Sequence, residues 1–98
     1  MKGATEPSYV LVDVQSLCAE GRYQVGYTVL GTLPSLGFDE SDVPSCIASL
    51  LPEHFDRTYR SKSKGSMNDV YKVEYGGKRL YVKFEVSNNC VYIISFHE

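Results

Sequence analysis

The most regular alternation of apolar and polar residues lies in the last third of the chain. Over residues 80–87, four apolar side chains at even positions alternate with polar ones, a period of two typical of a strand with one buried face. Residues 70–75 and 91–97 are similar segments. They are separated by Gly76-Gly77 and Asn88-Asn89, two pairs that tolerate the positive φ of hairpin turns. Residues 68–98 are therefore predicted to form a three-stranded antiparallel meander.

The register of the first hairpin follows from keeping the apolar side chains on one face of the sheet. A two-residue glycine loop pairs Val73 with Leu80 and sets Lys72 opposite Tyr81. Asn68 then falls on the same side as Lys72, away from the apolar face.

The second hairpin can be joined in two registers. A two-residue loop at residues 88–89 would set Leu80 opposite His97 and mix apolar with polar side chains. A three-residue loop at residues 88–90 keeps the faces apart and is the one predicted. It pairs Val82 with Phe96, Phe84 with Ile94, Val86 with Tyr92, Tyr81 with His97, and Lys83 with Ser95. One side of the sheet, named the polar face below, then carries Asn68, Lys72, Tyr81, Lys83 and His97.

The first part of the chain shows helical spacing instead. Residues 1–7 are predicted to be a flexible tail, and Ser8 is a candidate N-cap for a helix that ends at Gly21. The β-branched run at residues 9–12 leaves a strand as the alternative there. Residues 23–25 suit a short edge strand.

Two further helices are predicted before the sheet. Residues 28–36 offer one apolar face, although Gly31 and Pro34 weaken a helix there. The next helix is capped by Asp39 or Ser41 and is ended by Pro52. Its apolar stripe consists of Val43, Ile47, Leu50 and Leu51.

Residues 55–64 are predicted to be a further strand, with Arg57 and Tyr59 on one side and Arg60 and Lys62 on the other. Residues 61–66 would form a mobile basic loop. Helices first and strands afterwards indicate an α+β domain.

The length of 98 residues suits one domain with a single core. The longest apolar run is too short for a membrane span, and the first residues lack the apolar segment of a signal peptide, so a cytoplasmic protein is expected. The three cysteines have no metal-ligand spacing and are predicted to be buried thiols. They are Cys18, Cys46 and Cys90.

The net charge of −2 conceals a strong asymmetry. Residues 1–50 carry two basic and six acidic groups, whereas residues 57–83 carry eight basic groups against Asp69 and Glu74. Such a basic segment fits a polyanion site. It fits equally well a set of cations that only solvate exposed strands.

The sequence contains no GxSxG, P-loop, GxGxxG or HExxH motif, and no other metal-ligand spacing. A nucleophilic pair of Cys90 and His97 is disfavoured because the two residues lie at opposite ends of one strand. No cofactor and no metal ion are expected. The polar face instead offers a phenol, an imidazole, an amide and several cations.

That set of groups suits cleavage of RNA, in which the substrate supplies the nucleophile, its own 2′-hydroxyl. His97 can donate or accept a proton near neutral pH. Tyr81 can hold the attacking hydroxyl, or act as a base if Lys83 and Lys72 lower its pKa. Arg57 or Lys83 can clamp the phosphate.

Asn68 can position a base edge or the 2′-hydroxyl. The stacking platforms for bases would come from the tyrosines. The candidates are Tyr59, Tyr71, Tyr75 and Tyr92. Each residue also has an ordinary structural role open to it: a tyrosine or histidine on a polar strand is often solvated surface, and an asparagine at a strand start is often a turn residue.

Six segments of the chain form a recognisable set. They are Met67-Asn68-Asp69-Val70-Tyr71, Leu80-Tyr81-Val82-Lys83-Phe84, Ile94-Ser95-Phe96-His97-Glu98, the helical residues 10–21, Leu36-Gly37-Phe38-Asp39 and Glu53-His54-Phe55-Asp56-Arg57. Together they resemble the motility quorum-sensing regulator (MqsR) family of toxins over nearly the whole chain.

The resemblance implies a RelE-like α+β fold, with N-terminal helices packed on a C-terminal antiparallel sheet. It implies the toxin of a type II toxin–antitoxin system, a ribosome-independent endoribonuclease that cuts mRNA. It also implies an inhibitor, a zinc-containing antitoxin with a helix-turn-helix domain that is encoded next to the toxin.

The family's site residues correspond here to Arg57, Asn68, Tyr81 and His97. This chain departs from the usual pattern, because Arg57 and His97 each stand where a lysine is commoner and Asn68 stands where a glutamine is commoner. An arginine can clamp a phosphate but cannot lose a proton, so Arg57 is not an acid or base. The resemblance also requires one extra residue in the turn at residues 87–90.

The sequence therefore predicts a toxin that cleaves single-stranded mRNA without a metal ion, with Lys83 assisting the four site residues. The RNA backbone would be held by Arg60, Lys62, Lys64 and Lys72. The alternative is a non-enzymatic module whose basic strands bind nucleic acid or an acidic partner.

Overall fold

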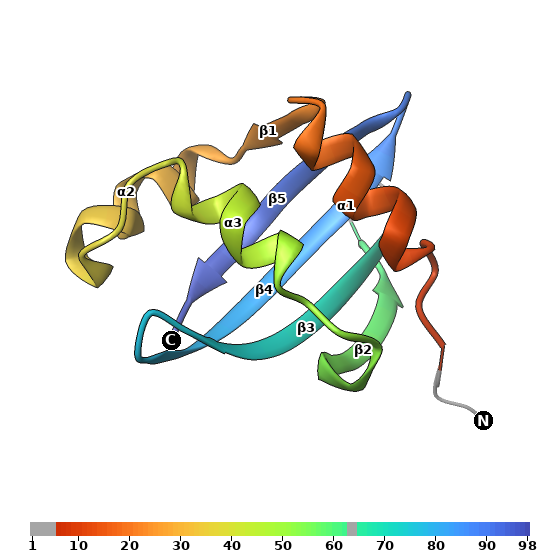
Figure 1. The fold of residues 1–98 in the computed structure, drawn as a ribbon. Coiled ribbons are helices and arrows are strands. Elements are labelled where there is room, and N and C mark those ends of the chain that lie inside the picture. The colour runs from red at the N-terminus through yellow and green to blue at the C-terminus, as the bar shows by residue number, and fades with distance from the viewer. Residues whose placement is uncertain (1–5, 63–64) are drawn as a thin grey trace.

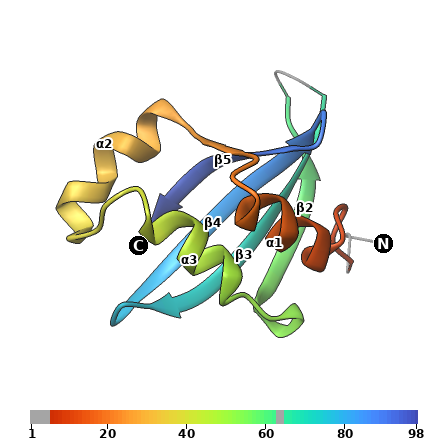
Figure 2. The same ribbon diagram turned by 45° about the horizontal axis from the view of Figure 1, so that its top comes forward.

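The computed structural model describes residues 6–62 and 65–98 and is shown in Figures 1 and 2. Within them the helices are α1 (Leu11–Ala19), α2 (Tyr27–Leu36) and α3 (Asp42–Ala48), and a short 3-10 turn covers Pro52–His54. The strands are β1 (Tyr23–Val25), β2 (Phe55–Arg60), β3 (Met67–Tyr75), β4 (Lys78–Ser87) and β5 (Cys90–His97). Most of the tail predicted at residues 1–7, and residues 63–64 of the predicted loop, lie outside the described part.

The five strands form one sheet in the order β1-β5-β4-β3-β2. Neighbouring strands are antiparallel except for β1, which pairs in parallel with β5. The predicted α+β class is confirmed, with a mixed rather than purely antiparallel sheet. The parallel pair arises because the chain returns from α1 along the outer edge of β5, where residues 23–25 form the predicted edge strand.

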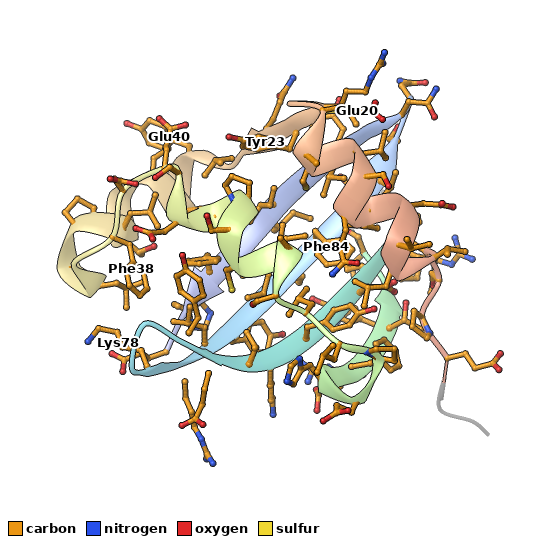
Figure 3. All side chains as sticks on the ribbon, viewed as in Figure 1. Glu20, Tyr23, Phe38, Glu40, Lys78 and Phe84 are labelled. Carbon is orange, nitrogen blue, oxygen red and sulfur yellow. The ribbon has the colours of Figure 1, made fainter. Side chains whose placement is uncertain are left out.

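The helices pack on one face of the sheet. In Figures 1 and 2, α1 and α3 lie side by side over it, and α2 packs along β5. Figure 3 shows Phe84 between helices and sheet, where it is fully buried. Burial of one such side chain is worth about 1.5–3 kcal/mol. The core therefore holds the helices on this face, and the polar face lies on the opposite side.

The N-terminus of α1 differs from the prediction in its cap. Residues 11–19 form a helix rather than a strand, but the residue before it is Val10, not Ser8. The backbone N–H groups of Ser8 and Tyr9 donate to the two carboxylate oxygens of Asp69, each over 3.0 Å. Ser8 is therefore held against β3 by a fully buried carboxylate and is not available to cap the helix.

The other two helices agree with the prediction in position. Helix α2 forms in spite of Gly31 and Pro34, and Gly37 ends it in the left-handed conformation at φ 79°. Helix α3 follows Ser41, which makes no side-chain capping bond. The apolar stripe predicted for it is wrong at Leu51, which is 49% exposed, because the chain leaves the helix after Ala48.

The first hairpin has the predicted register, with Val73 opposite Leu80 and Lys72 opposite Tyr81. In the second hairpin, three predicted pairs are confirmed at the far end from the turn. They are Tyr81 with His97, Val82 with Phe96, and Lys83 with Ser95.

The predicted three-residue loop is wrong. Asn88 and Asn89 alone form the turn, at φ 52° and 56°, the positive values that a tight two-residue hairpin turn requires. Near the turn, Phe84 is therefore opposite Ile93, and Val86 opposite Val91.

A β-bulge supplies the missing residue. The register shifts between Lys83 and Phe84, where Ile94 is the additional residue of β5. This bulge moves the remainder of β5 by one position. It thus does what the longer loop was predicted to do, and it keeps Tyr81 and His97 on one face.

None of the helices in the described part of the chain is both long enough and apolar enough to cross a membrane.

Candidate active site

Strand β2 brings a second set of side chains onto the polar face. Arg57 pairs with Val70 and Tyr59 with Asn68, two neighbours that lie on the same side of β3. The two side chains therefore share a side, as predicted. A bulge between Phe55 and Arg57 leaves Asp56 as an extra residue, and this places its carboxylate beside Arg57.

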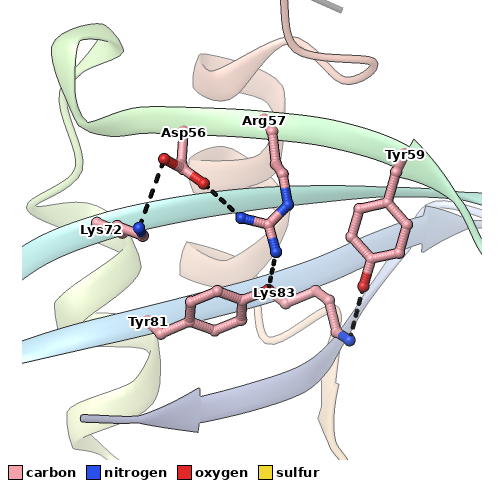
Figure 4. A network of polar contacts seen from close by, with 6 residues as sticks. All are labelled: Asp56, Arg57, Tyr59, Lys72, Tyr81 and Lys83. Atoms are coloured by element: carbon pink, nitrogen blue, oxygen red, sulfur yellow. Dashed lines mark hydrogen bonds and ion pairs between the residues drawn. The ribbon is translucent and has the colours of Figure 1, made fainter. Parts of the chain in front are cut away.

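The centre of the polar face is a hydrogen bond between Arg57 and Tyr81, drawn in Figure 4. Nη2 of Arg57 donates to the Tyr81 hydroxyl over 2.9 Å, and Nη1 contacts the Asp56 carboxylate at 2.7 Å. The guanidinium also lies 5.6 Å from the ring centroid of Tyr81 and 5.7 Å from that of Tyr59. One side of Arg57 is thus anchored by a carboxylate while the other contacts a phenol.

His97 lies directly beside Tyr81. Their rings stack with centroids 5.1 Å apart and planes 14° from parallel. Nδ1 of His97 lies 2.9 Å from the carbonyl oxygen of Glu98, so Nε2 is the nitrogen that can meet a ligand. The strand register therefore brings a phenol, an imidazole and a guanidinium together from β4, β5 and β2.

A cavity of about 700 Å³ adjoins this cluster. Its lining includes both rings of the stacked pair and basic side chains of the first hairpin. The lining residues are Ser49, His54, Lys72, Val73, Glu74, Arg79, Leu80, Tyr81, His97 and Glu98. The volume is within the range of small-molecule and cofactor sites.

The two lysines predicted to act on Tyr81 have other partners. Nζ of Lys83 donates to the Tyr59 hydroxyl over 2.9 Å, and Nζ of Lys72 lies 3.7 Å from the second oxygen of Asp56. Arg57 is the cation in contact with the Tyr81 hydroxyl. Lys83 is the next residue after Tyr81 on the same side of β4, so its positive charge is still close to the cluster.

Asn68 lies on the polar face but apart from this cluster. It is 4% exposed and lines a second cavity, of about 390 Å³, together with Tyr59 and Lys83. Along the sheet, the rows of Asp69, Val70 and Tyr71 separate it from the row of Lys72 and Tyr81. Of the five predicted catalytic residues, Tyr81 and His97 therefore line the first cavity and Asn68 and Lys83 the second, while Arg57 belongs to neither lining.

The structure does not gather the predicted RNA-binding cations at one cavity. Lys62 lines it, and Nη1 of Arg60 donates to the Gly65 carbonyl over 2.5 Å in the adjoining turn. Lys72 belongs to the first cavity, and Lys64 lies outside the described residues.

Two of the predicted stacking platforms are wrong. Tyr71 is fully buried against Phe84 on the helix side of the sheet, and Tyr75 also faces that side, where its hydroxyl donates to Asp42. Tyr59 lies on the polar face, and Tyr92 is partly exposed there opposite Glu85.

Two acidic residues of the polar face escaped the sequence prediction. Asp56 is placed by a bulge that the alternation of residues does not reveal. Glu85 is 5% exposed, and the Ser66 hydroxyl donates to its carboxylate. Its position in the strict alternation of residues 80–87 did assign it to the polar face, which was the one available indication.

The three cysteines are unbonded thiols. Cys18 and Cys46 are buried as predicted, whereas Cys90 is partly exposed. Burial raises the pKa of the Cys18 thiol to about 11 and that of the Cys46 thiol to about 12. Among residues 6–62 and 65–98, no three His, Cys, Asp or Glu side chains are grouped as a metal site would require.

The protein-family model described as "Motility quorum-sensing regulator, toxin of MqsA" matches residues 6–98. The chain belongs to the MqsR toxin family. A comparison with curated proteins gave no match. Membership identifies the chain as a toxin of a toxin–antitoxin system, with an antitoxin of the MqsA kind as its partner. The helices on one face of a five-stranded sheet are consistent with the RelE-like fold that the resemblance implied.

Proposed function

We propose that this MqsR-family toxin is an endoribonuclease that cleaves single-stranded mRNA independently of the ribosome. The observation that carries the proposal is the contact of Arg57 and His97 with the same phenol, that of Tyr81, on the open side of the sheet. These groups can move a proton and stabilise anionic charge within a few ångströms of one another.

In the proposed step the 2′-hydroxyl oxygen attacks the adjacent phosphorus, and the bond from phosphorus to the 5′-oxygen breaks. The 2′-hydroxyl proton passes to a base of the site, and a proton is delivered to the departing 5′-oxygen. The products are a 2′,3′-cyclic phosphate and a 5′-hydroxyl, with no net change in redox state or proton number. Tyr81 and His97 divide the two proton transfers between them.

The negative charge of the phosphorane requires cations at the same place. The guanidinium of Arg57 presents planar donors suited to phosphate oxygens, and its contact with Asp56 fixes its orientation. Lys83 adds a second positive charge in the same row of the sheet as Arg57, across Val70. Arg60, Lys62, Lys64 and Lys72 would hold the RNA backbone on either side.

The partner in the cell would be a zinc-containing antitoxin with a helix-turn-helix domain, acting in the cytoplasm. Co-expression tests this partner: a small cysteine-rich protein encoded next to the toxin should co-purify with it and suppress RNA cleavage. Cleavage that persists at saturating amounts of the neighbouring protein would contradict its role as the inhibitor.

The activity is tested with purified protein and an unstructured RNA in EDTA. Discrete fragments that carry 5′-hydroxyl ends, and no cleavage where the cut nucleotide is 2′-deoxy, are expected. Retardation of intact RNA in a gel, without fragments, would instead support a non-enzymatic binding module and overturn the proposal.

A further inference from the structure

The second cavity has no role in the proton transfers described above. Its lining combines an aromatic ring, two cations and two polar side chains that are almost completely buried. The residues concerned are Tyr59, Lys62, Lys83, Asn68 and Glu85. A cavity of about 390 Å³ is large enough for one flat heterocycle beside a phosphate.

Asn68 is the unusual member of this set. Its side chain is 4% exposed, and its Oδ1 has no hydrogen-bond partner among the residues that the structure describes. Its position is fixed by its backbone, because the Thr58 hydroxyl donates to its carbonyl over 3.1 Å and Tyr59 is its pair on β2. A buried acceptor without a donor is costly, so a ligand that brings an N–H group would be favoured.

The remaining side chains suit the same ligand. Glu85 lies in the same lining, where its carboxylate accepts the hydrogen bond of Ser66. The ring of Tyr59 offers a stacking surface, and its hydroxyl is held by Lys83 at 2.9 Å. Lys62 and Lys83 bring positive charge for the phosphates next to a bound base.

Resting on the proposed function, we propose that this cavity binds one base of the RNA beside the cleaved phosphate. Asn68 accepts a hydrogen bond from the exocyclic amino group of that base. With this contact the cavity selects a base with an exocyclic amino group over uracil, whose exocyclic atoms are both carbonyl oxygens and whose base edge has only the ring N3–H as a donor. Asn68 is thus a specificity-determining residue that reads a base edge, while the Tyr81 cluster performs the chemistry.

The test is a thermodynamic cycle that compares the wild-type protein and an Asn68 variant on RNA with and without base analogues. At each position around the cut, guanine is replaced by hypoxanthine, adenine by purine and cytosine by pyrimidin-2-one, which removes only the amino group. At one position the wild-type protein should lose roughly tenfold or more in kcat/KM with the analogue. Asn68→Ala should cleave base and analogue at equal, reduced rates, and Asn68→Gln should recover part of the discrimination.

Equal losses for the wild type and Asn68→Ala, or no effect of an analogue at any position, would overturn the proposal. If Asn68→Ala does not fold, as judged by circular dichroism, Asn68→Ser takes its place in the cycle. The same cycle on Kd, with RNA that is 2′-deoxy at the cut, needs no cleavage. If the protein binds RNA with the natural base more tightly than RNA with the analogue but cuts no RNA, the proposed nuclease activity is overturned and the base site is retained.

Discussion

The guanidinium of Arg57 donates a hydrogen bond to the hydroxyl of Tyr81 over 2.9 Å, across 24 positions of sequence. Strand β3 lies between the two strands that carry these residues. The side chains therefore reach over an intervening strand, whose buried Val70 is paired with Arg57 on one side and, on the other, with Lys83, two residues along β4 from Tyr81. The small apolar residue leaves the space in which the longer polar side chains meet.

Replacing Tyr81 by Phe removes this hydroxyl and keeps the ring that stacks on His97. We expect kcat for RNA cleavage to fall by about 10²–10⁴-fold, the usual contribution of a group engaged in proton transfer. Initial rates on a fluorescent RNA would measure it. Tyr27→Phe is the matched control, since Tyr27 is 91% exposed on α2, and it should cleave at the wild-type rate. Equal rates for both variants would remove Tyr81 from the mechanism.

Replacing His97 by Ala separates catalysis from binding. Cleavage should be abolished. The Kd for an RNA that is 2′-deoxy at the cut should hardly change, because His97 is exposed and, in the part of the chain described, contacts none of the cations proposed to hold phosphates. Fluorescence anisotropy would give Kd and denaturing gels the cleavage. A variant that loses binding and cleavage together would assign His97 to holding the RNA.

RNA binding should weaken steeply with salt, because cations on the polar face replace counterions along the phosphate backbone. Lys62→Glu should lower the slope of log Kobs against log salt by roughly 0.7 for each phosphate of the single strand that the variant no longer neutralises. Arg22→Glu is the control, because it changes the net charge by the same amount. Arg22 lies before β1 and pairs with Glu20, so this variant should leave the slope unchanged. Similar slopes for the two variants would mean that only total charge matters.

The thiols should react in the order of their exposure. At pH 8 Cys90 should be alkylated first, then Cys18 and last Cys46, since the thiolate is the reactive form and burial raises the pKa of Cys18 to about 11 and of Cys46 to about 12. Mass spectrometry after timed quenching gives the order. Early modification of Cys46 would mean that α3 opens readily.

Replacing Tyr71 by Phe should stabilise the protein. The Tyr71 hydroxyl is buried with no partner among the described residues, while its ring stacks on Phe84, a contact that phenylalanine retains. The free energy of unfolding should rise by about 1 kcal/mol at pH 7. In contrast, Tyr75→Phe should lower it, because the Tyr75 hydroxyl donates to Asp42 at 2.9 Å.

Tyr71→Phe should also change how the stability of the protein depends on pH in alkaline solution. Burial, and after it the charge of Asp69, raises the pKa of Tyr71 to about 12 from the ordinary 10.0. The stability that this pKa difference contributes is fully present below pH 10 and is lost as the pH rises through 12. Between these two values Tyr71 ionises freely only in the unfolded chain. Tyr71→Phe should therefore lose less stability between pH 10 and 12. Parallel melting curves for the two proteins would contradict this.

The strands of the C-terminal half were predictable because one of their faces is buried. A slip of one residue would exchange Leu80 and Tyr81 between core and solvent, so the hydrophobic pattern alone fixes the register far from the turn. The turn itself was mispredicted. The pattern shows that β5 needs an extra residue but not where, and Asn88-Asn89 favours the short loop strongly enough to move that residue to Ile94.

The site was predictable where it depends on register and not where it depends on burial. Strand pairing placed Tyr81 beside His97 and Lys72 beside Tyr81. It could not show that Arg57 rather than a lysine contacts Tyr81, since a bulge in β2 decides this. Nor could it show that Asn68 is almost fully buried, because the alternation of residues assigns a side chain to a face but not its exposure on that face.

The additional residue at Ile94 also limits how the length of this chain can vary. Removing one residue of β4 between the bulge and the Asn88-Asn89 turn, with the bulge kept, would set Tyr81 opposite Phe96 and turn the imidazole to the helix side of the sheet. Removing one residue of β5 in the same interval would instead restore an uninterrupted ladder and leave the imidazole opposite Tyr81. Relatives should therefore lose a residue here from β5 more readily than from β4.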